Sequence, residues 1–400
     1  MKYDVTIVGA GPAGSTTAKF LVEKGFKVIL IDKNKFPRDK PCGGGLPFRI
    51  LDRFKYVDNW DFIESYGYGG IAFSPSMKYK LEMEEDKPIA AMALREKFDY
   101  KLVKLAVKNG AVLKDGKAVE DIKILKDRVK IFLDDGSNID SEIVVGADGV
   151  WSTVAKKTGL RQKNIKMGVC VLQEYKLDEE TLDKFFGKSR FCYIHNRFQN
   201  LDGYGWVFPK KEHLNIGVGE ILTHRGSSTK NNLLKIYEEY IKTLKKDKII
   251  PENIKIEKFK GGALPVVPLE KTYCDRVILV GDAAGFINPI SGEGIYYAMS
   301  SGEIAARIIS EALEKGEINE QFLSKYQKAW KKDFGKDLNL LYQMVKKRGI
   351  NSNEKLFRVA SNDKKLSELL IKVVMGQISL QKYKWKIIRR YLYALIKNKF

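Results

Sequence analysis

The sequence predicts an α/β protein: a nucleotide-binding domain made from three pieces of the chain, an inserted antiparallel-sheet domain, and a helical, basic C-terminal region. Three observations lead to this prediction. The chain opens with a strand, a glycine turn, a helix and a second strand. It returns to the order strand, turn, helix after residue 260. Between these parts, segments with near-alternating apolar residues recur at 66–95 and 168–221, as in half-buried strands.

The opening residues predict a βαβ unit. Residues 3–8 and 27–31 are apolar and strand-like, and residues 12–24 between them have a helical pattern that ends at Gly25. Two parallel strands joined by a helix indicate a parallel sheet covered by helices. This unit opens the nucleotide-binding domain.

The rest of the chain completes the plan. A helix is expected at 97–109, short strands at 111–145, a strand at 276–280, a helix at 294–313, and helices beyond about 318. The expected domains are therefore the nucleotide-binding domain at 1–65, 96–165 and 262–318, the sheet domain at 66–95 and 166–261, and the helical region at 319–400.

Composition limits the class of protein. The 400 residues are 44% apolar, so a large core is possible. Four widely spaced cysteines without a CxxC pair suit a reducing cytoplasm, and three scattered histidines offer no recognisable ligand set. No apolar run approaches the ~20 residues that span a bilayer, and the start lacks the pattern of a secretory leader. We expect a cytoplasmic protein without a metal.

The turn after the first strand predicts a dinucleotide site. Gly9, Gly11 and Gly14 form a GxGxxG pattern that permits a tight turn, a close approach of backbone to a pyrophosphate, and close packing of helix on strand. The helix N-terminus adds free N–H groups and a positive dipole end. Asp32 ends the second strand, where a carboxylate would accept the ribose hydroxyls of an adenosine.

Two further segments, GADG at 146–149 and GDAA at 281–284, each follow an apolar strand. In this order they resemble the second and third fingerprints of the glutathione-reductase-like flavoprotein fold, which flavin hydroxylases also use. The resemblance implies a Rossmann-like FAD-binding domain. It also implies that Asp282 holds the ribityl chain and that the segment NPISGEG lies near the isoalloxazine. No second GxGxxG unit is present, so we expect electrons from an external donor, NAD(P)H or ferredoxin.

Further segments narrow the family. KPCGGGL at 40–46, REKFD at 95–99, the pattern YxWxFP at 204–209 and SGEGIYYAM at 291–299 together resemble the geranylgeranyl reductase family. The family's aromatic motif usually begins with a proline three residues before the tyrosine, where this chain has Leu201. The resemblance implies FAD as cofactor and a prenyl lipid or quinone as substrate. The residues expected to bind the cofactor are Gly9, Gly11, Ala13, Gly14, Asp32, Lys33, Cys42, Gly43, Arg95, Asp148, Gly281, Asp282, Pro289, Gly292, Gly294 and Ile295.

The aromatic motif predicts a surface for an apolar chain. Tyr204, Trp206 and Phe208 alternate, so on a strand they point to one face; core packing of the sheet is the alternative. An isolated alkene accepts hydride only if a proton is added too, so we expect hydride from reduced flavin N5 and protonation of the other carbon. Aromatic faces would stabilise the developing cation. Cys42 and Tyr204 are the candidate proton donors, and the expected catalytic residues are Cys42, Tyr204, Trp206 and Phe208.

The C-terminal region carries much of the positive charge. Residues 345–400 hold 15 Lys or Arg and 3 Asp or Glu, a net charge of +12 of the chain's +21. On a helix over 382–399, Trp385, Ile388, Leu392 and Leu395 share a face, with Tyr391 and Ile396 beside it. A basic amphipathic helix bearing Trp and Tyr suits an anionic membrane surface on the cytoplasmic side. A helix packed on its own domain is the alternative, and nothing resembles a nucleic-acid recognition motif.

Two other functions remain open at this point. Flavin-dependent hydroxylases and halogenases share the expected fold, although halogenases favour a WxWxI pattern where this chain has Tyr204-Gly205-Trp206-Val207-Phe208. A basic flavoprotein that binds a membrane or RNA without catalysis is the non-enzymatic alternative.

Overall fold

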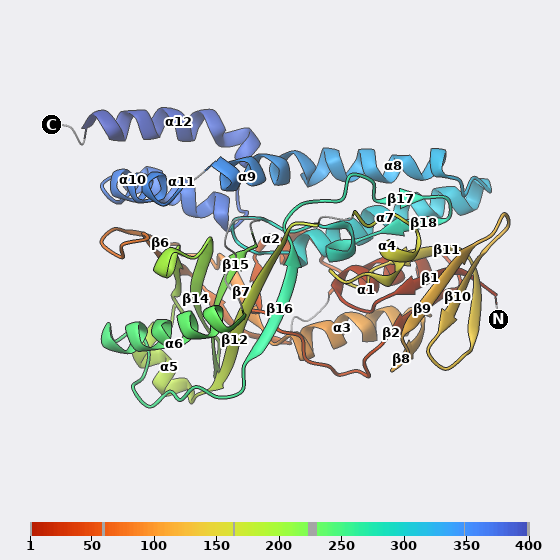
Figure 1. Cartoon of the computed structure of the whole chain (residues 1–400), viewed down its shortest axis with the longest axis horizontal. Coiled ribbons are helices and arrows are strands. Elements are labelled where there is room, and N and C mark those ends of the chain that lie inside the picture. Colours follow the sequence, from red (N-terminus) through yellow and green to blue (C-terminus); the bar gives the residue numbers. More distant parts are fainter. Residues whose placement is uncertain (1, 58–60, 163–164, 223–229, 348, 398–400) are drawn as a thin grey trace. The chain divides into compact units, whose positions relative to one another are not determined.

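The computed structural model describes residues 2–57, 61–162, 165–222, 230–347 and 349–397 (Figure 1). The chain forms two compact units, each made from three pieces. The first comprises residues 1–40, 95–165 and 264–339, and the second 41–94, 166–263 and 340–400. The units differ from the expected domains in three segments. Residues 41–65 and the last helices belong to the unit with the inserted sheet, and 319–339 belong to the nucleotide-binding unit.

The first unit is built on an eight-stranded sheet. Five parallel strands form its centre in the order β18-β11-β1-β2-β8. They are β1 (Lys2–Val8), β2 (Val28–Asp32), β8 (Val112–Asp115), β11 (Asn138–Gly146) and β18 (Val277–Leu279). β17 (Tyr273–Cys274) pairs with β18, and the hairpin of β9 (Val119–Ile124) and β10 (Val129–Leu133) pairs antiparallel with β11. β2 is buried along its length, as strands covered on both faces are.

Helices of the first unit bury the sheet. The helices are α1 (Pro12–Val22), α3 (Arg95–Lys108), α4 (Thr153–Lys157), α7 (Ile295–Lys315) and α8 (Glu320–Trp330), followed by a π-helical turn at Lys331–Gly335. α1 packs against β2, α3 and α7, which places the start of α1 beside the ends of several parallel strands. The expected helices at 12–24, 97–109 and 294–313 are therefore confirmed within one or two residues at each end.

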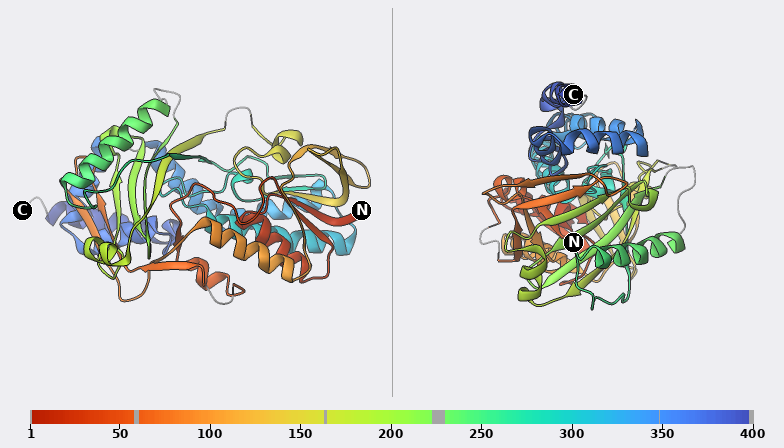
Figure 2. Two further views of the ribbon diagram at one scale, coloured as in Figure 1. Left: turned by 90° about the horizontal axis from the view of Figure 1, so that it is seen from below. Right: turned by 90° about the vertical axis from the view of Figure 1, so that its left-hand side faces the viewer.

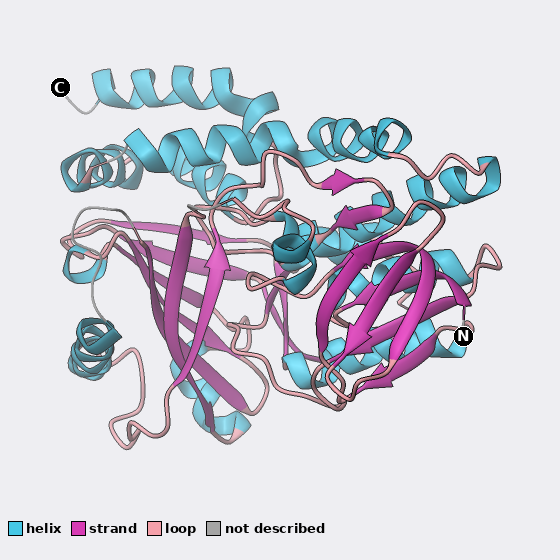
Figure 3. Cartoon of the chain, turned by 45° about the vertical axis from the view of Figure 1, so that its right-hand side comes forward, coloured by secondary structure: helices cyan, strands magenta, loops and turns pink. Residues whose placement is uncertain are grey.

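The second unit is built on a seven-stranded sheet in the order β16-β12-β15-β14-β13-β5-β6. Strands are drawn in magenta in Figure 3. Its strands are β5 (Gly69–Phe73), β6 (Lys80–Glu84), β12 (Met167–Lys176), β13 (Cys192–Asn196), β14 (Gly203–Pro209), β15 (His213–Ile221) and β16 (Lys260–Pro265). α6 (Lys230–Lys246) packs on β12 and β15 (Figure 2). Tyr237 and Tyr240 of α6 are fully buried. A smaller sheet contains β3 (Gly45–Pro47), β7 (Ala90–Ala93) and β4 (Ile63–Gly67), of which β3 follows Cys42 closely in the chain. The unit also contains α2 (Arg49–Arg53) and α5 (Glu179–Phe186).

The C-terminal helices pack on the β6 edge of this sheet. They are α10 (Ile350–Ser361), α11 (Lys364–Val374) and α12 (Leu380–Lys397), preceded by α9 (Lys336–Lys347). Leu81 of β6 shares an apolar cluster with α10, α11 and the inner side of α12. Within the described ranges, no helix is long and apolar enough to cross a membrane.

Candidate functional site

The glycine turn after β1 is shaped by close contacts. Gly9 has a φ of +101°, and a Cβ there would lie 2.3 Å from the carbonyl oxygen of Ala147. A Cβ on Gly14 would lie 1.9 Å from the carbonyl oxygen of Gly9. Only glycine fits both positions, so α1 begins directly behind the end of β1. At Gly11 the nearest described atom to a Cβ is Arg38 Nη2, at 3.7 Å, which leaves the backbone approachable.

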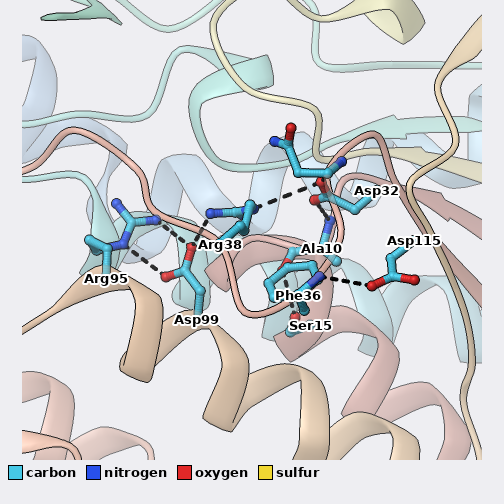
Figure 4. A network of polar contacts seen from close by, with 9 residues as sticks. Ala10, Ser15, Asp32, Phe36, Arg38, Arg95, Asp99 and Asp115 are labelled. Atoms are coloured by element: carbon cyan, nitrogen blue, oxygen red, sulfur yellow. Dashed lines mark hydrogen bonds and ion pairs between the residues drawn. The ribbon is translucent and has the colours of Figure 1, made fainter. Parts of the chain in front are cut away.

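Asp32 ends β2 and braces this turn (Figure 4). Its carboxylate accepts hydrogen bonds from the backbone N–H of Ala10 at 2.9 Å and of Asn34 at 2.9 Å. The Arg38 guanidinium lies 3.8 Å from the same carboxylate. Asp32 therefore fixes the glycine turn and lies at the strand end where a ribose is expected.

Arg38 also belongs to a buried ion cluster at the start of α3. Arg95 forms a bidentate ion pair with Asp99, in which both N···O distances are 2.8 Å. Arg38 Nη1 donates to the same carboxylate at 2.9 Å. Burial opposes ionisation of Asp99, but the charges and hydrogen bonds of the two guanidinium groups hold its pKa below the usual value. Arg95, expected to bind the cofactor, is thus engaged by Asp99, and Arg38 links this cluster to Asp32 (Figure 4).

The second and third fingerprints lie beside the first. Ala147 of the second fingerprint donates its N–H to the carbonyl of Val8 at 2.7 Å. Asp148 accepts the backbone N–H groups of Thr153 and Val154 in the first turn of α4, at 2.7 and 3.2 Å, and Ser152 is the N-cap residue of this helix. Burial raises the pKa of Asp148 against these bonds.

Gly281 of the third fingerprint packs on α1. A Cβ at Gly281 would lie 3.0 Å from the Cβ of Ala13, and the Gly281 N–H donates to Ser301 Oγ at 3.0 Å. Asp282, next in the chain, has Lys40 Nζ 3.6 Å from its carboxylate. The ammonium group of Lys40 and the guanidinium of Arg38 bring two cations to a region expected to bind phosphates.

The loop before α7 is stabilised by hydrogen bonds among its own residues. The side-chain oxygen of Asn288 accepts the N–H groups of Ile290 and Ser291, at 2.9 and 3.2 Å, and the Glu293 carboxylate accepts the N–H of Tyr296 at 2.6 Å. The loop carries the expected cofactor residues Pro289, Gly292, Gly294 and Ile295 into the start of α7. It follows the third fingerprint directly in the chain.

These residues of the first unit fit a dinucleotide. The cradle at Gly9 and Gly14 has no room for a side chain, the start of α1 supplies helix-end N–H groups, and Arg38 and Lys40 supply positive charge. Of the expected cofactor residues in this unit, Lys33 is exposed, while the other members lie in or beside the three fingerprints and the α3 cluster. No group of three or more potential metal ligands exists among the described residues.

In the second unit, the expected aromatic residues follow one another on one face of β14. The ring centroids of Tyr204 and Trp206 are 5.8 Å apart, and those of Trp206 and Phe208 are 6.4 Å apart. Trp206 pairs across the ladder with Gly217 of β15, and a Cβ on Gly217 would lie 2.1 Å from the indole ring. The indole therefore fills space that a side chain at 217 would occupy, and only 6% of Trp206 is exposed.

The Cys42 segment packs against this stripe. A Cβ on Gly43 would lie 2.8 Å from the Phe208 ring and 3.4 Å from Trp206 Nε1. The Gly44 N–H donates to Cys42 Sγ at 3.4 Å, and the Gly44 carbonyl accepts the N–H of Ala93 at 2.9 Å. The four expected catalytic residues thus come together in one unit.

Of these four, two carry a proton that could be transferred. Burial, with the nearby thiols of Cys170 and Cys42, raises the pKa of Tyr204 well above its ordinary value, so the phenol stays protonated at neutral pH. Cys42, the other candidate donor, is a partly exposed residue with a free thiol.

The sequence analysis did not identify several residues near the nucleotide site and near the aromatic stripe. Arg38 lies between the recognised motifs, and Lys40 opens the KPCGGGL segment without having been singled out as a cofactor residue. Asn215 accepts a hydrogen bond from Trp206 of the aromatic stripe and donates one to Glu174, to which Lys210 also donates. These side-chain bonds depend on strand register. A lysine directly after the YxWxFP pattern was the one visible signal.

Comparisons with known proteins agree on the class. Residues 2–334 match the model of the FAD binding domain family. The chain is 35% identical over 340 residues to the digeranylgeranylglycerophospholipid reductase of Methanocaldococcus jannaschii, covering 82% of each chain. A geranylgeranyl bacteriochlorophyll reductase-like protein from Thermoplasma acidophilum has a similar structure, with a TM-score of 0.81 at 23% identity over 96% of this chain and 98% of that one. A flavin-dependent brominase is less similar, with a TM-score of 0.75 at 20% identity over 100% and 99% of the two chains.

Proposed function

Because this chain belongs to the geranylgeranyl reductase family of FAD-dependent oxidoreductases, we propose that it saturates isoprenoid double bonds in a geranylgeranyl-type membrane lipid or prenylated quinone. The Methanocaldococcus relative is named for a reductase of a digeranylgeranyl phospholipid, and the match covers 82% of the present chain. The observation that carries the proposal is the apolar aromatic stripe of β14, against which the Gly43 backbone, next to Cys42, is packed in the second unit. A long hydrocarbon needs such burial and few polar contacts.

When bound and reduced, FAD supplies a hydride from its N5 atom. The side chains of the second unit supply what an isolated alkene otherwise lacks. The faces of Tyr204, Trp206 and Phe208 offer negative π density to a carbon that becomes cationic, worth about 1–2 kcal/mol in a dry site. Cys42 and Tyr204 each hold a proton beside that stripe, and either can deliver it to the less substituted carbon. Tyr204→Phe and Cys42→Ala distinguish the two donors, because only the loss of the true donor slows reduction of the lipid.

The first unit orients the cofactor. The turn at Gly9 to Gly14 and the first turn of α1 would hold the pyrophosphate, and Asp32 the adenosine ribose. Asp282 would hold the ribityl chain, with Lys40 beside it. Since the chain has one GxGxxG unit, we propose an external electron donor, NAD(P)H or ferredoxin.

The test is a single turnover without oxygen. The flavin is reduced chemically, a geranylgeranyl lipid is added, and flavin reoxidation is followed together with the mass of the lipid, which gains two hydrogens per saturated bond. Trp206→Ala should slow the reaction by about tenfold to a thousandfold, the equivalent of roughly 1–4 kcal/mol. A parent protein that leaves the lipid unchanged and inserts oxygen or halogen into another substrate would support the hydroxylase or halogenase alternative instead.

We also propose that α12 attaches the protein to an anionic membrane surface on the cytoplasmic side, where a prenyl lipid is found. Trp385, Ile388, Leu392, Tyr393 and Ile396 are 44–64% exposed on the outer side of α12. Lys386, Arg389 and Lys397 are exposed beside them. An apolar row with Trp and Tyr and flanking cations suits the boundary between lipid head groups and acyl chains. The inner side of the helix is already occupied, because Ile387, Tyr391, Ala394 and Leu395 pack on the unit's own apolar cluster.

A further inference from the structure

A lysine is completely buried at the end of the aromatic strand. Lys210 follows Pro209, and its side chain is 0% exposed. Its ammonium group donates a hydrogen bond to the carboxylate of Glu174 on β12. Burial raises the pKa of the neighbouring Cys192 thiol to about 12 against the opposing charge of Lys210. A buried ammonium group needs such a partner, because desolvation of an unpaired charge is very unfavourable.

Glu174 in turn contacts Asn215, its cross-strand partner on β15. The side-chain amide of Asn215 uses both of its ends. Nδ2 donates to Glu174 Oε2 at 2.8 Å and to the carbonyl oxygen of Cys42 at 3.2 Å, while Oδ1 accepts the indole N–H of Trp206 at 2.7 Å. Asn215 is fully buried, so water does not compete for these bonds.

The charges fix the direction of this amide. Reversal of the Asn215 side chain would point its oxygen at the Glu174 carboxylate and the Cys42 carbonyl, and its NH₂ group at the indole N–H. Each contact would then join two acceptors or two donors. The Glu174 carboxylate accepts hydrogen bonds from both Lys210 and Asn215, so the observed direction of the amide is the one that satisfies every partner.

We infer that Lys210, Glu174 and Asn215 are positioning residues that hold the Trp206 indole and the Cys42 loop in one arrangement. A buried ion pair contributes little net stability compared with apolar residues of the same volume, so its effect here is orientation. The two groups that Asn215 joins are residues to which the proposed function assigns roles, and the consequence for catalysis rests on that function. The arrangement of the indole does not depend on it.

Fluorine NMR of the full-length FAD-bound protein, labelled with 5-fluorotryptophan, tests the arrangement. The chain has five tryptophans, and the Trp206 signal is the one that Trp206→Phe removes. Glu174→Gln keeps the side-chain volume and removes the charge, and Asn215→Leu removes both bonds. We expect the Trp206 signal to shift and to split or broaden in both variants. In single turnovers with a geranylgeranyl lipid, the rate should fall by about tenfold to a hundredfold, with a smaller change in the lipid concentration that gives half-maximal rate.

The matched control lies one residue away. Gln173 precedes Glu174 on β12 and points to the opposite face, where it bonds to Tyr175 and Tyr237 under α6. Gln173→Leu should lower the melting temperature and leave both the Trp206 signal and the turnover rate unchanged.

A double variant tests the ion pair itself. Lys210→Met combined with Glu174→Gln should restore part of the turnover rate that Lys210→Met alone loses, because no unpaired buried charge remains.

Two results would overturn the inference. One is a folded Glu174→Gln protein whose Trp206 signal and turnover rate match those of the parent. The other is a Gln173→Leu protein that moves the Trp206 signal as far as Asn215→Leu does, which would indicate general loosening of the sheet. If the parent protein does not reduce the lipid at all, the proposed function is wrong, and the fluorine signals still decide the positioning role.

Discussion

At the scale of single residues, the buried carboxylate of Asp99 organises the start of α3. Two arginines reach it from different parts of the first unit, Arg95 from the same helix and Arg38 from the segment after β2. Because Arg38 also lies near Asp32, the cluster connects α3 with the strand end that braces the glycine turn. The ionised state of one residue therefore supports the shape of the nucleotide site.

Asp99 predicts an acid-sensitive contribution to stability. Its pKa in the folded protein is below the unfolded value of about 3.9, so its contribution is complete above that pH and is lost as the pH falls through the folded pKa. Asp99→Asn should lower the free energy of unfolding at neutral pH by about 3 kcal/mol or more, because two arginines lose a buried counter-charge. The variant should also lose less stability than the parent when the pH falls below about 4.

Thermal unfolding of both proteins at a series of pH values measures this effect. Asp121→Asn is the control, because the Asp121–Lys157 pair is exposed and should contribute little. Parallel pH profiles for the parent protein and Asp99→Asn would show that the buried cluster does not titrate as described.

Asp282 predicts a change in cofactor binding. Its carboxylate lies in the third fingerprint next to Lys40, where it would accept the ribityl hydroxyls. Asp282→Ala should retain less FAD after purification and bind added FAD more weakly, by about 1.5–3 kcal/mol, the usual contribution of hydrogen bonds to a charged group. The ratio of flavin absorbance to protein absorbance and a titration with FAD give both quantities.

A matched substitution at the opposite end of the same strand controls for folding. Asp275 precedes β18 and accepts the Glu320 N–H at 2.6 Å at the start of α8, away from the third fingerprint. Asp275→Ala should reduce stability and leave the FAD affinity unchanged. Equal flavin content in Asp282→Ala and the parent protein would remove Asp282 from the cofactor site.

At the scale of elements, α12 has two apolar sides where the sequence pattern indicated one. The row of Trp385, Ile388, Leu392 and Ile396 is exposed, whereas Leu395 and Tyr391, expected on or beside the same face, pack inward. The helical period alone could not separate the sides, because apolar residues occur around most of the helix. Only the position of α10 and α11 decides which side is covered.

The outer side of α12 predicts binding to anionic vesicles. Replacement of Trp385 and Leu392 by serine should weaken binding of the protein to vesicles of phosphatidylcholine and phosphatidylglycerol, with little change in melting temperature. Binding of the parent should fall as salt rises, since exposed charges are screened over about 8 Å at physiological ionic strength. Sedimentation with vesicles at several salt concentrations measures both effects.

The inner side of the helix supplies the contrasting variant. Ile387→Ser should lower the melting temperature, because Ile387 packs on the apolar cluster beneath α12. A Trp385 and Leu392 variant that binds vesicles as well as the parent protein would leave the exposed row without a membrane role.

At the scale of the whole molecule, the described residues form one apolar core around the parallel sheet, one beneath α6, and a smaller apolar cluster beneath α12. The expected cofactor residues belong to the unit of the first core, except Cys42 and Gly43, which belong to the second unit. A ligand that binds only the folded form stabilises it by about 2.7 kcal/mol at a hundredfold excess over its dissociation constant. The first unit should therefore unfold at a lower temperature when FAD is removed, and added FAD should restore its melting temperature.

Calorimetry of the FAD-free protein over a range of FAD concentrations tests this dependence. ADP should give a smaller rise in melting temperature, since it can occupy the Gly9 turn but cannot reach Asp282. A melting temperature that is independent of FAD would contradict the assignment of the nucleotide site to the folded first unit.

The two parts of the candidate site differed in how far the sequence could predict them. The fingerprints at Gly9, at 146–149 and at 281–284 depend on local turns, whose backbone demands are visible in single residues. The contacts of Arg38 with Asp99 and of Glu174 with Asn215 join residues 61 and 41 positions apart. Such pairs depend on strand register and on the docking of α3, which no local pattern specifies.

Gly217 and Trp206 occupy one shared volume on the face of the sheet. Since the indole lies where a Cβ at 217 would project, a larger residue on β15 would require a smaller one on β14, and the reverse. Relatives with a side chain at the position of Gly217 should therefore have a small residue at that of Trp206. Where both changes occur, the aromatic surface offered to the hydrocarbon would move from one strand to the next without any change in the backbone.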